Sequence, residues 1–212
     1  GGEGMGQMED TAKALVAALT NKPDLGEIQV VVVCGNNQDL RKKLAKDTKW
    51  PAGTVVKPAE DAAVPAAGSG AAAASGEAKT EAQQGAGTAV EGEQKVALSV
   101  LGFVTDMERW MLASDIVVTK AGPGAIAEAA ATATPIMLYD FLPGQEEGNV
   151  VFVKERGMGG YEDTPEKAAE KVCEWLSGGE ELLHSMGEAA KAAAYPKAAL
   201  TIAEHITQML RE

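Results

Sequence analysis

The sequence predicts an α/β fold, a Rossmann-like parallel sheet with helices on both faces. Runs of β-branched residues, which suit buried parallel strands, alternate along the chain with segments of helical spacing. Glycine-rich turns stand where strands give way to helices. Consecutive parallel strands are joined by right-handed helical crossovers, so this alternation indicates one α/β unit after another.

The first quarter of the chain predicts a loop, a helix and two strands. Apolar residues recur at helical spacing as far as Asn21, directly after the glycines of residues 1 to 6. Residues 28 to 34, IQVVVVC, form an almost unbroken β-branched run, which we expect to be a strand buried on both faces. A short polar helix at 38–46 and a strand at 53–56 should follow.

Residues 58 to 94 differ in character from the rest of the chain. They are low-complexity Ala, Gly, Glu and Gln with almost no large side chain to bury. Burial therefore cannot offset the entropy cost of ordering them. We expect a disordered insertion that divides one domain into two parts, residues 1 to 57 and residues 95 to 212, the second of which carries the C-terminal helices.

The alternating pattern returns after the insertion. Strands are expected at residues 96–101, 115–119 and 135–139. Thr105 and Glu108 have the spacing of a capping box, so a short helix should run from there to about Ala113.

The last third of the chain is predicted to be helical, from Thr164 as N-cap before Pro165 to Arg211. His184 and His205 lie in this part without a nearby Ser, Cys or acidic partner of the triad type. We interpret both histidines as helix-surface residues.

Composition excludes several classes of function. A formal net charge of -12, without any cluster of Lys and Arg, argues against nucleic-acid binding. Cys34 and Cys173 have neither metal-ligand nor disulfide spacing, and we interpret them as reduced, packed thiols. No run of about 18 apolar residues could span a bilayer, which leaves a peripheral membrane role open.

Two glycine-rich loops are candidate phosphate sites. GGEGMG at residues 1 to 6 precedes the first helix, and KAGPG at 120–124 follows a strand and opens another helix. Amides without a Cβ in the way can approach phosphate oxygens at the positive end of a helix. A structural turn would use the same residues, but two such loops make a metal-free diphosphate site more credible than one. A loop of this kind normally follows a strand, so a strand is expected ahead of Gly1.

Polar side chains close to these loops are candidate sugar ligands. Glu128 lies one turn into the helix that the second loop opens. Its carboxylate could accept hydrogen bonds from both ribose hydroxyls, or simply stabilise the helix end. DFLPGQEEGN at 140–149 offers the donors and acceptors that read sugar hydroxyls, although a solvated loop before a helix would use similar residues.

Four motifs together resemble a known family. GGEGMG, GFVTDMERWM, ASDIVVTKAGPGAIAEA and PGQEEGNV, in this order, are similar to the C-terminal half of the monogalactosyldiacylglycerol synthases, the plastid galactolipid enzymes of plants and algae. The resemblance covers nearly all segments outside 58–94. The wider glycosyltransferase family 28, with bacterial lipid glucosyltransferases and the peptidoglycan N-acetylglucosaminyltransferase, shares the same skeleton. The sequence departs from its relatives at 130–134, AATAT, where they usually carry a bulkier residue and a glycine before the proline.

The resemblance implies the nucleotide-sugar domain of a GT-B glycosyltransferase, whose first strand would precede Gly1. The glycine loops would face the diphosphate, Phe103 and Val104 the uracil, and Glu128 the ribose. The implied UDP-binding residues are Gly2, Glu3, Gly4, Met5, Gly6, Phe103, Val104, Lys120, Gly122, Pro123, Gly124, Ala125 and Glu128. The implied sugar-binding residues are Gln145, Glu146 and Asn149.

The implied reaction is inverting: a diacylglycerol hydroxyl attacks the anomeric carbon of UDP-galactose, and UDP leaves. The family's candidate base is a histidine of the N-terminal domain, so we expect no catalytic residue, no metal and no cofactor in this chain, and no activity from it alone. Diacylglycerol would bind through the N-terminal domain, with peripheral contact at the chloroplast envelope membrane. Two alternatives stay open, a donor such as UDP-glucose or UDP-N-acetylglucosamine, and a truncated module that binds UDP-sugar without catalysis.

Overall fold

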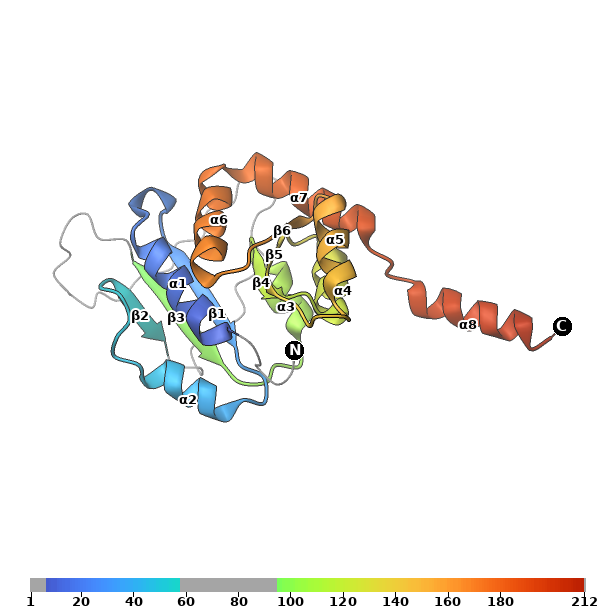
Figure 1. The fold of residues 1–212 in the computed structure, drawn as a ribbon, viewed down its shortest axis with the longest axis horizontal. Coiled ribbons are helices and arrows are strands. Elements are labelled where there is room, and N and C mark those ends of the chain that lie inside the picture. The colour runs from blue at the N-terminus through green and yellow to red at the C-terminus, as the bar shows by residue number, and fades with distance from the viewer. Residues whose placement is uncertain (1–6, 58–94, 212) are drawn as a thin grey trace, which may run out of the picture.

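The structure is a computed structural model that describes residues 7 to 57 and 95 to 211 (Figure 1). The strands are β1 (Ile28–Val33), β2 (Thr54–Lys57), β3 (Val96–Leu101), β4 (Val117–Lys120), β5 (Ile136–Asp140) and β6 (Gly159–Tyr161). The helices are α1 (Met8–Thr20), the 3-10 helix η1 (Pro23–Leu25), α2 (Gln38–Lys46), α3 (Met107–Leu112), α4 (Pro123–Ala131), α5 (Glu147–Glu155), α6 (Pro165–Ser177), α7 (Glu180–Ala193) and α8 (Ala198–Met209). The strands expected within the described residues are all present, and β6 is an addition. The predicted disordered insertion at 58–94 and the loop at 1–6 lie outside the described residues.

The described strands form two three-stranded sheets, both parallel. The first sheet has the order β1-β3-β2, and the second has the order β4-β5-β6. Val30 pairs with Leu98 in the first sheet, and Leu138 pairs with Tyr161 in the second. The α/β class with parallel strands and covering helices is therefore confirmed, with the strands distributed over two sheets.

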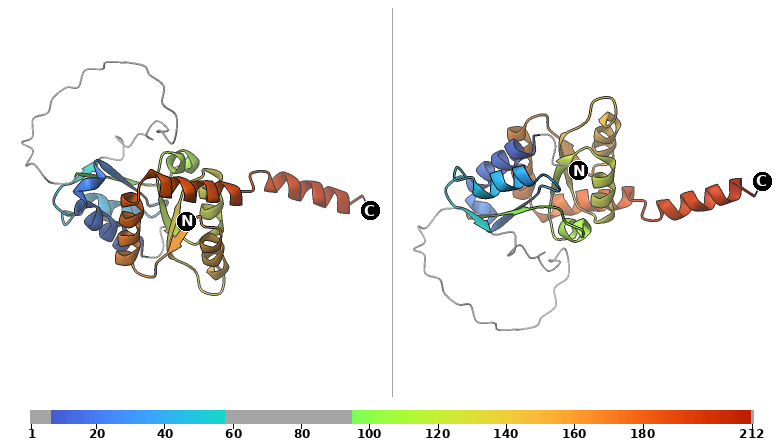
Figure 2. Two further views of the ribbon diagram at one scale, coloured as in Figure 1. Left: turned by 90° about the horizontal axis from the view of Figure 1, so that it is seen from above. Right: turned by 90° about the horizontal axis from the view of Figure 1, so that it is seen from below.

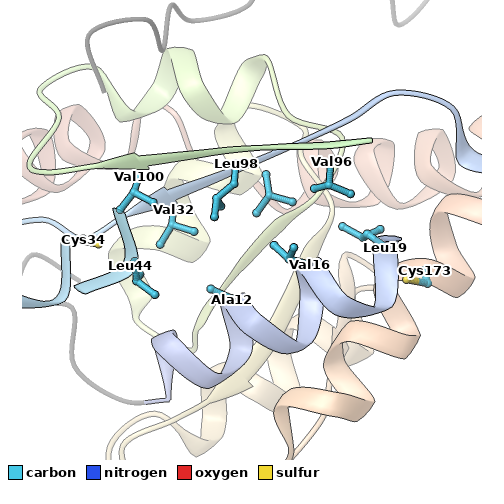
Figure 3. Close-up of a cluster of buried hydrophobic side chains, with 11 residues drawn as sticks. Ala12, Val16, Leu19, Val32, Cys34, Leu44, Val96, Leu98, Val100 and Cys173 are labelled. Atoms are coloured by element: carbon cyan, nitrogen blue, oxygen red, sulfur yellow. The ribbon is translucent and has the colours of Figure 1, made fainter. Parts of the chain in front are cut away.

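The first sheet has its hydrophobic cluster on one face, while Ser99 and Leu101 of β3 are buried outside that cluster. Val30 and Val32 of β1 and Leu98 of β3 meet Ala12 and Val16 of α1 in an aliphatic cluster that Figure 3 shows between the helix and the strands. Val31 and Val33 stay partly exposed, outside this cluster. The prediction that residues 28 to 34 are buried on both faces is therefore wrong. The alternation of β1 follows from a helix layer on one side.

The second sheet is packed on both faces. Ile136 and Leu138 of β5 belong to a cluster with side chains of α4, α5 and α7. Met137 and Tyr139 point to the other side, into a cluster with Trp175 of α6. Because α6 also contributes Cys173 to the core of the first sheet, this helix connects the two sheets.

The short strand β6 was not expected from the sequence, because its three residues are Gly159, Gly160 and Tyr161. It adds to β5 in parallel, with Gly159 opposite Ile136. A Cβ on Gly159 would collide with the carbonyl oxygen of Ile136, so the glycine permits this strand to approach β5. A glycine pair of this kind resembles a turn in sequence and is a strand only through its partner.

Two helix starts test the capping predictions. Thr164 is the N-cap of α6, and its hydroxyl accepts a hydrogen bond from the Lys167 amide at 3.3 Å, as predicted. The predicted capping box at Thr105 and Glu108 is wrong. Asp106 is the N-cap of α3 and makes no side-chain cap bond, because its carboxylate lies 3.6 Å from Arg109 instead.

The last third is helical, as predicted, with breaks between α6, α7 and α8. Figures 1 and 2 show α8 projecting away from the rest of the protein, and all its residues are exposed. His184 and His205 are exposed on α7 and α8, and both cysteines are buried and free, as predicted. No helix within residues 7–57 and 95–211 has the length and apolar character needed to cross a membrane.

Candidate functional site

The candidate site lies at the carboxyl ends of β4 and β5. Lys120 ends β4, Asp140 ends β5, and the two residues are paired after a register shift between Thr119 and Lys120. The Ala121 amide donates to the Asp140 carbonyl oxygen at 2.8 Å, which carries the pairing one residue past β4. Ligands of parallel α/β sheets bind at this end of the strands, where loops enter helices.

The N-terminus of α4 presents uncapped backbone amides. Gly122 is the N-cap, Pro123 follows at the first helical position, and no side chain caps this end. The amides of Gly124 and Ala125 belong to the first turn, where an α-helix has no acceptor of its own. These amides and the positive helix end make a place that can accept an anion.

The glycines of this turn are not explained by backbone strain. Gly122 has a φ of -70°, and Gly124 is not among the positive-φ glycines. A Cβ on Gly124 would meet no atom within 4 Å. The described chain therefore leaves open space at Gly124, on the side where a bound group could approach the backbone.

Lys120 and Glu146 form an ion pair beside this turn. The Lys120 ammonium lies 3.0 Å from Glu146 Oε1, and the two side chains are 27% and 11% exposed. Glu146 Oε2 accepts a hydrogen bond from the Leu142 amide at 2.8 Å. Burial raises the pKa of Glu146, but the Leu142 amide and the Lys120 ammonium lower it by more, so the net pKa lies below the ordinary 4.5.

Asn149 makes a second link between the two loops. Its side-chain amide donates to the Ala121 carbonyl oxygen at 2.9 Å. Glu146 and Asn149 thus hold two successive residues, Lys120 and Ala121, from the start of α5. The segment 140–149 and the loop after β4 form one connected unit.

Two other predicted ligands are exposed and free to contact a ligand. Glu128 lies in the second turn of α4, and Gln145 lies just before α5; both are exposed. Neither side chain makes a hydrogen bond or ion pair with any residue in the described part of the chain. Their polar groups are therefore available to a ligand.

The remaining predicted residues follow a strand of the first sheet or lie outside the described residues. Phe103 is 62% exposed and Val104 is partly buried, both just after β3 of the first sheet. Gly2, Glu3, Gly4, Met5 and Gly6 lie outside the described residues. Within the described ranges, no three His, Cys, Asp or Glu side chains are grouped so that they could hold a metal ion.

Backbone groups complete the site and were not named from the sequence. The Leu142 amide and the Ala121 carbonyl oxygen are the partners of Glu146 and Asn149. The residue types Leu142 and Ala121 do not indicate that their backbone groups bond Glu146 and Asn149. The ion pair could have been predicted, because Lys120 ends one strand of the parallel sheet and Glu146 lies in the loop after the next.

Sequence comparison identifies a matching family. The family described as "Glycosyltransferase family 28 C-terminal domain" matches residues 72 to 202 of the chain.

Individual relatives extend this match over the whole chain. Monogalactosyldiacylglycerol synthase 3, chloroplastic, of Arabidopsis thaliana is 33% identical over 213 residues, which are 100% of this chain and 36% of the relative. Monogalactosyldiacylglycerol synthase 2, chloroplastic, of the same plant is 35% identical over 99% of this chain and 35% of the relative. Monogalactosyldiacylglycerol synthase, chloroplastic, of Spinacia oleracea is 34% identical over 100% of this chain and 32% of the relative. The chain thus spans about a third of the length of these relatives.

Solved structures show a weaker likeness. The crystal structure of MurG from Acinetobacter baumannii superimposes with a TM-score of 0.48 at 21% identity, over 54% of this chain and 34% of that chain.

Proposed function

Because the chain belongs to the glycosyltransferase family 28 C-terminal domain family, we propose that it is the donor-binding part of an inverting galactosyltransferase. The enzyme transfers galactose from UDP-galactose to 1,2-diacylglycerol and makes monogalactosyldiacylglycerol. Support for this substrate pair comes from relatives at 33 and 35% identity that carry the name of the synthase. The chain spans about a third of their length, so the proposal assigns it one part of the reaction.

The observation that carries the proposal is the open first turn of α4 beside Lys120. The free amides of Gly124 and Ala125 and the positive helix end favour an anion. Lys120 adds a positive charge at the same edge of the sheet. A diphosphate needs both hydrogen-bond donors and a countercharge, and this arrangement supplies them.

The other predicted ligands are assigned around this diphosphate site. Glu128 accepts hydrogen bonds from the ribose hydroxyls, and Phe103 and Val104 contact the uracil. The segment 140–149, with Gln145, Glu146 and Asn149, lies beside the galactose.

The steps of the reaction are divided between this chain and the N-terminal domain of the whole enzyme. The acceptor hydroxyl oxygen attacks the anomeric carbon, the bond from that carbon to the diphosphate oxygen breaks, and the electron pair leaves on UDP. The α4 amides and Lys120 stabilise the charge that develops there. A general base must lie within about 3 Å of the acceptor hydroxyl to take its proton. His184 and His205 are exposed on α7 and α8, in the last third of the chain, and we do not assign this role to them.

The base and the diacylglycerol site are therefore assigned to the N-terminal domain of the whole enzyme. That enzyme contacts its membrane peripherally. The chloroplast is its proposed location, because the relatives are named as chloroplastic.

Binding of UDP to the chain tests this proposal. Glu128→Ala should weaken UDP binding about 10- to 150-fold, the loss of one charge-assisted contact worth about 1.5 to 3 kcal/mol. Glu170→Ala removes an exposed helical carboxylate from α6 and is the matched control. Isothermal titration calorimetry measures both variants.

Two results would count against it. Equal UDP affinity for folded Glu128→Ala and wild type would remove Glu128 from the site. Tighter binding of UDP-glucose or UDP-N-acetylglucosamine than of UDP-galactose would mean that this nucleotide sugar is the donor instead.

A further inference from the structure

We propose that Arg41 of α2 is a further donor-binding residue, whose guanidinium donates a hydrogen bond to a carbonyl oxygen of the uracil base. The inference rests on the proposed function, which places the uracil at Phe103 and Val104, and it deepens that assignment by adding a charged side chain. Arg41 belongs to none of the four motifs that carry the family resemblance, so only the tertiary structure points to it.

The first argument is the place of Arg41 in the fold. The Cys34 amide donates to the Leu101 carbonyl oxygen at 2.9 Å, so the ends of β1 and β3 lie side by side. A Cβ on Gly102, the residue after β3, would lie 3.4 Å from Arg41 Nη1 and 3.7 Å from its Cζ. The guanidinium therefore lies against the end of β3, one residue ahead of Phe103, which is 62% exposed.

The second argument is that the guanidinium has free donors. Arg41 is partly exposed, and its side chain makes no hydrogen bond or ion pair with any residue in the described part of the chain. Burial raises the pKa of the Cys34 thiol, and the nearby charge of Arg41 offsets part of that rise. A buried neutral thiol does not neutralise a guanidinium, so the five N–H donors of Arg41 remain available to a ligand.

The third argument is the difference between two helix starts. Asn37 is the N-cap of α2, and its Oδ1 accepts a hydrogen bond from the Leu40 amide at 2.9 Å. The start of α4 has no side-chain cap and lies beside Lys120, where the proposed function puts the diphosphate. The first sheet thus offers a side-chain cation beside a capped helix, and the second sheet offers open amides. These suit the base and the diphosphate, the two ends of the nucleotide.

The chemistry of uracil fits a guanidinium. Uracil carries two carbonyl oxygens, which accept hydrogen bonds, and a guanidinium donates without accepting. A hydrogen bond from a charged donor is stronger than one between neutral groups. Arg41 therefore favours a base with a carbonyl oxygen in its direction and disfavours one that presents an amino group there.

The first experiment compares uridine with UDP. Arg41→Met removes the guanidinium and keeps an unbranched side chain over Gly102, and it should weaken binding of both ligands by the same factor, about tenfold. Lys42→Met removes the neighbouring exposed cation of α2 and is the matched control, which should bind both ligands as wild type does. Calorimetry measures UDP, and ligand-observed NMR measures the weaker uridine.

The second experiment changes the base instead of the protein. Sulfur replaces one carbonyl oxygen in 2-thio-UDP and the other in 4-thio-UDP, and it accepts hydrogen bonds poorly. For the oxygen that Arg41 contacts, this replacement should weaken binding to wild type several-fold, and the loss should fall below twofold in Arg41→Met, because both changes remove the same bond. A general loss of structure in Arg41→Met would lower the affinity for every ligand alike and leave the sulfur effect intact.

The outcomes separate this inference from the proposed function. If wild type bound no UDP, the proposed function would fail and the inference with it. Equal UDP affinity for wild type and Arg41→Met, both with the same circular dichroism spectrum, would overturn the inference alone. So would an equal loss in Lys42→Met, a loss for UDP that uridine does not share, or the same two sulfur effects in wild type and Arg41→Met.

Discussion

The two sheets have the same parallel three-stranded architecture and differ in where they place their charged groups. Beside the first sheet, Lys13 of α1 lies 2.8 Å from Glu9 and 2.9 Å from Asp47, and Lys43 of α2 lies 2.6 Å from Glu9. This network joins α1 and α2 across the molecular surface. Beside the second sheet, Lys120 and Glu146 pair at the carboxyl ends of the strands, with less exposed side chains.

The two sets of ion pairs also differ in exposure and in what lies beside them. Lys13 and Lys43 keep 38% and 63% of their side chains exposed, where water and salt screen the interaction. The network holds α1 and α2 together, and its Glu9 lies in the first turn of α1. Lys120 and Glu146 stand next to the uncapped turn of α4, the place that the proposed function assigns to the diphosphate.

The sheets also differ in how hydrophobic clusters cover their central strands. Leu98 of β3 is fully buried against α1 in a cluster on one face of the first sheet, while Ser99 and Leu101 are buried outside that cluster. Leu138 of β5 is equally buried, and its strand is covered by α4, α5 and α7 on one side and by α6 on the other. A strand held on both faces has less freedom to close a cavity.

The largest effect should come from truncating these two leucines. We expect Leu138→Ala to cost about 4 to 5 kcal/mol of unfolding free energy and Leu98→Ala about 3, since the cost of a cavity depends on how far its walls can relax. Urea denaturation followed by circular dichroism measures both. Equal costs, or a larger cost for Leu98→Ala, would show that the two sheets are enclosed alike.

A smaller and stabilising effect is expected at Ala133, after the end of α4. Ala133 has a φ of 56°, and the bonds from its amide to Ala130 and from the Thr134 amide to Ala129 close the helix as a Schellman motif. This position prefers glycine, because a Cβ costs about 1 kcal/mol in the left-handed region. Ala133→Gly should therefore stabilise the protein by about 0.5 to 1 kcal/mol.

The control for this change is Ala127→Gly, at an exposed position inside α4. This change should lower the free energy of unfolding by about 0.5 to 1 kcal/mol, since glycine is unfavourable within a helix. Thermal unfolding of both variants gives the two signs. A lower melting temperature for Ala133→Gly would mean that the left-handed turn is not formed in solution.

The smallest effect is the pH dependence of the Lys120–Glu146 pair. The folded pKa of Glu146 is lowered below 4.5, so its stabilisation is fully present above pH 4.5 and is lost as the pH falls through the folded pKa. The stability difference between wild type and Glu146→Gln should therefore be constant from neutral pH to about pH 5 and should shrink below it. The pKa values of Glu9 and Asp47 are also lowered, chiefly by hydrogen bonds from Lys13. These carboxylates titrate in both proteins, so their contributions cancel in this difference.

Urea denaturation at closely spaced pH values measures this difference. A difference that grows on acidification would contradict the charged pair.

The departure at 130–134 shows what sequence and structure each contribute. The resemblance led us to expect a departure from the family's pattern at these residues, where this chain has AATAT. The structure shows the consequence, an alanine in a left-handed conformation at the end of α4. A sequence carries no φ angle, so the strain became visible only in the fold.

The sequence by itself determined the order of strands and helices, the parallel class, the Thr164 cap and the glycine turn at 120–124. These features depend on local periodicity and on residues such as glycine and proline, whose backbone preferences act within a few positions. It also placed Lys120, Glu146 and Asn149 in the site by resemblance. Tertiary structure alone decided β6, the one-sided burial of β1, the uncapped start of α3 and the bonds that Glu146 and Asn149 make. Each of these depends on a partner distant in sequence, such as Ile136 for Gly159 or Lys120 for Glu146, and no local pattern specifies such a partner.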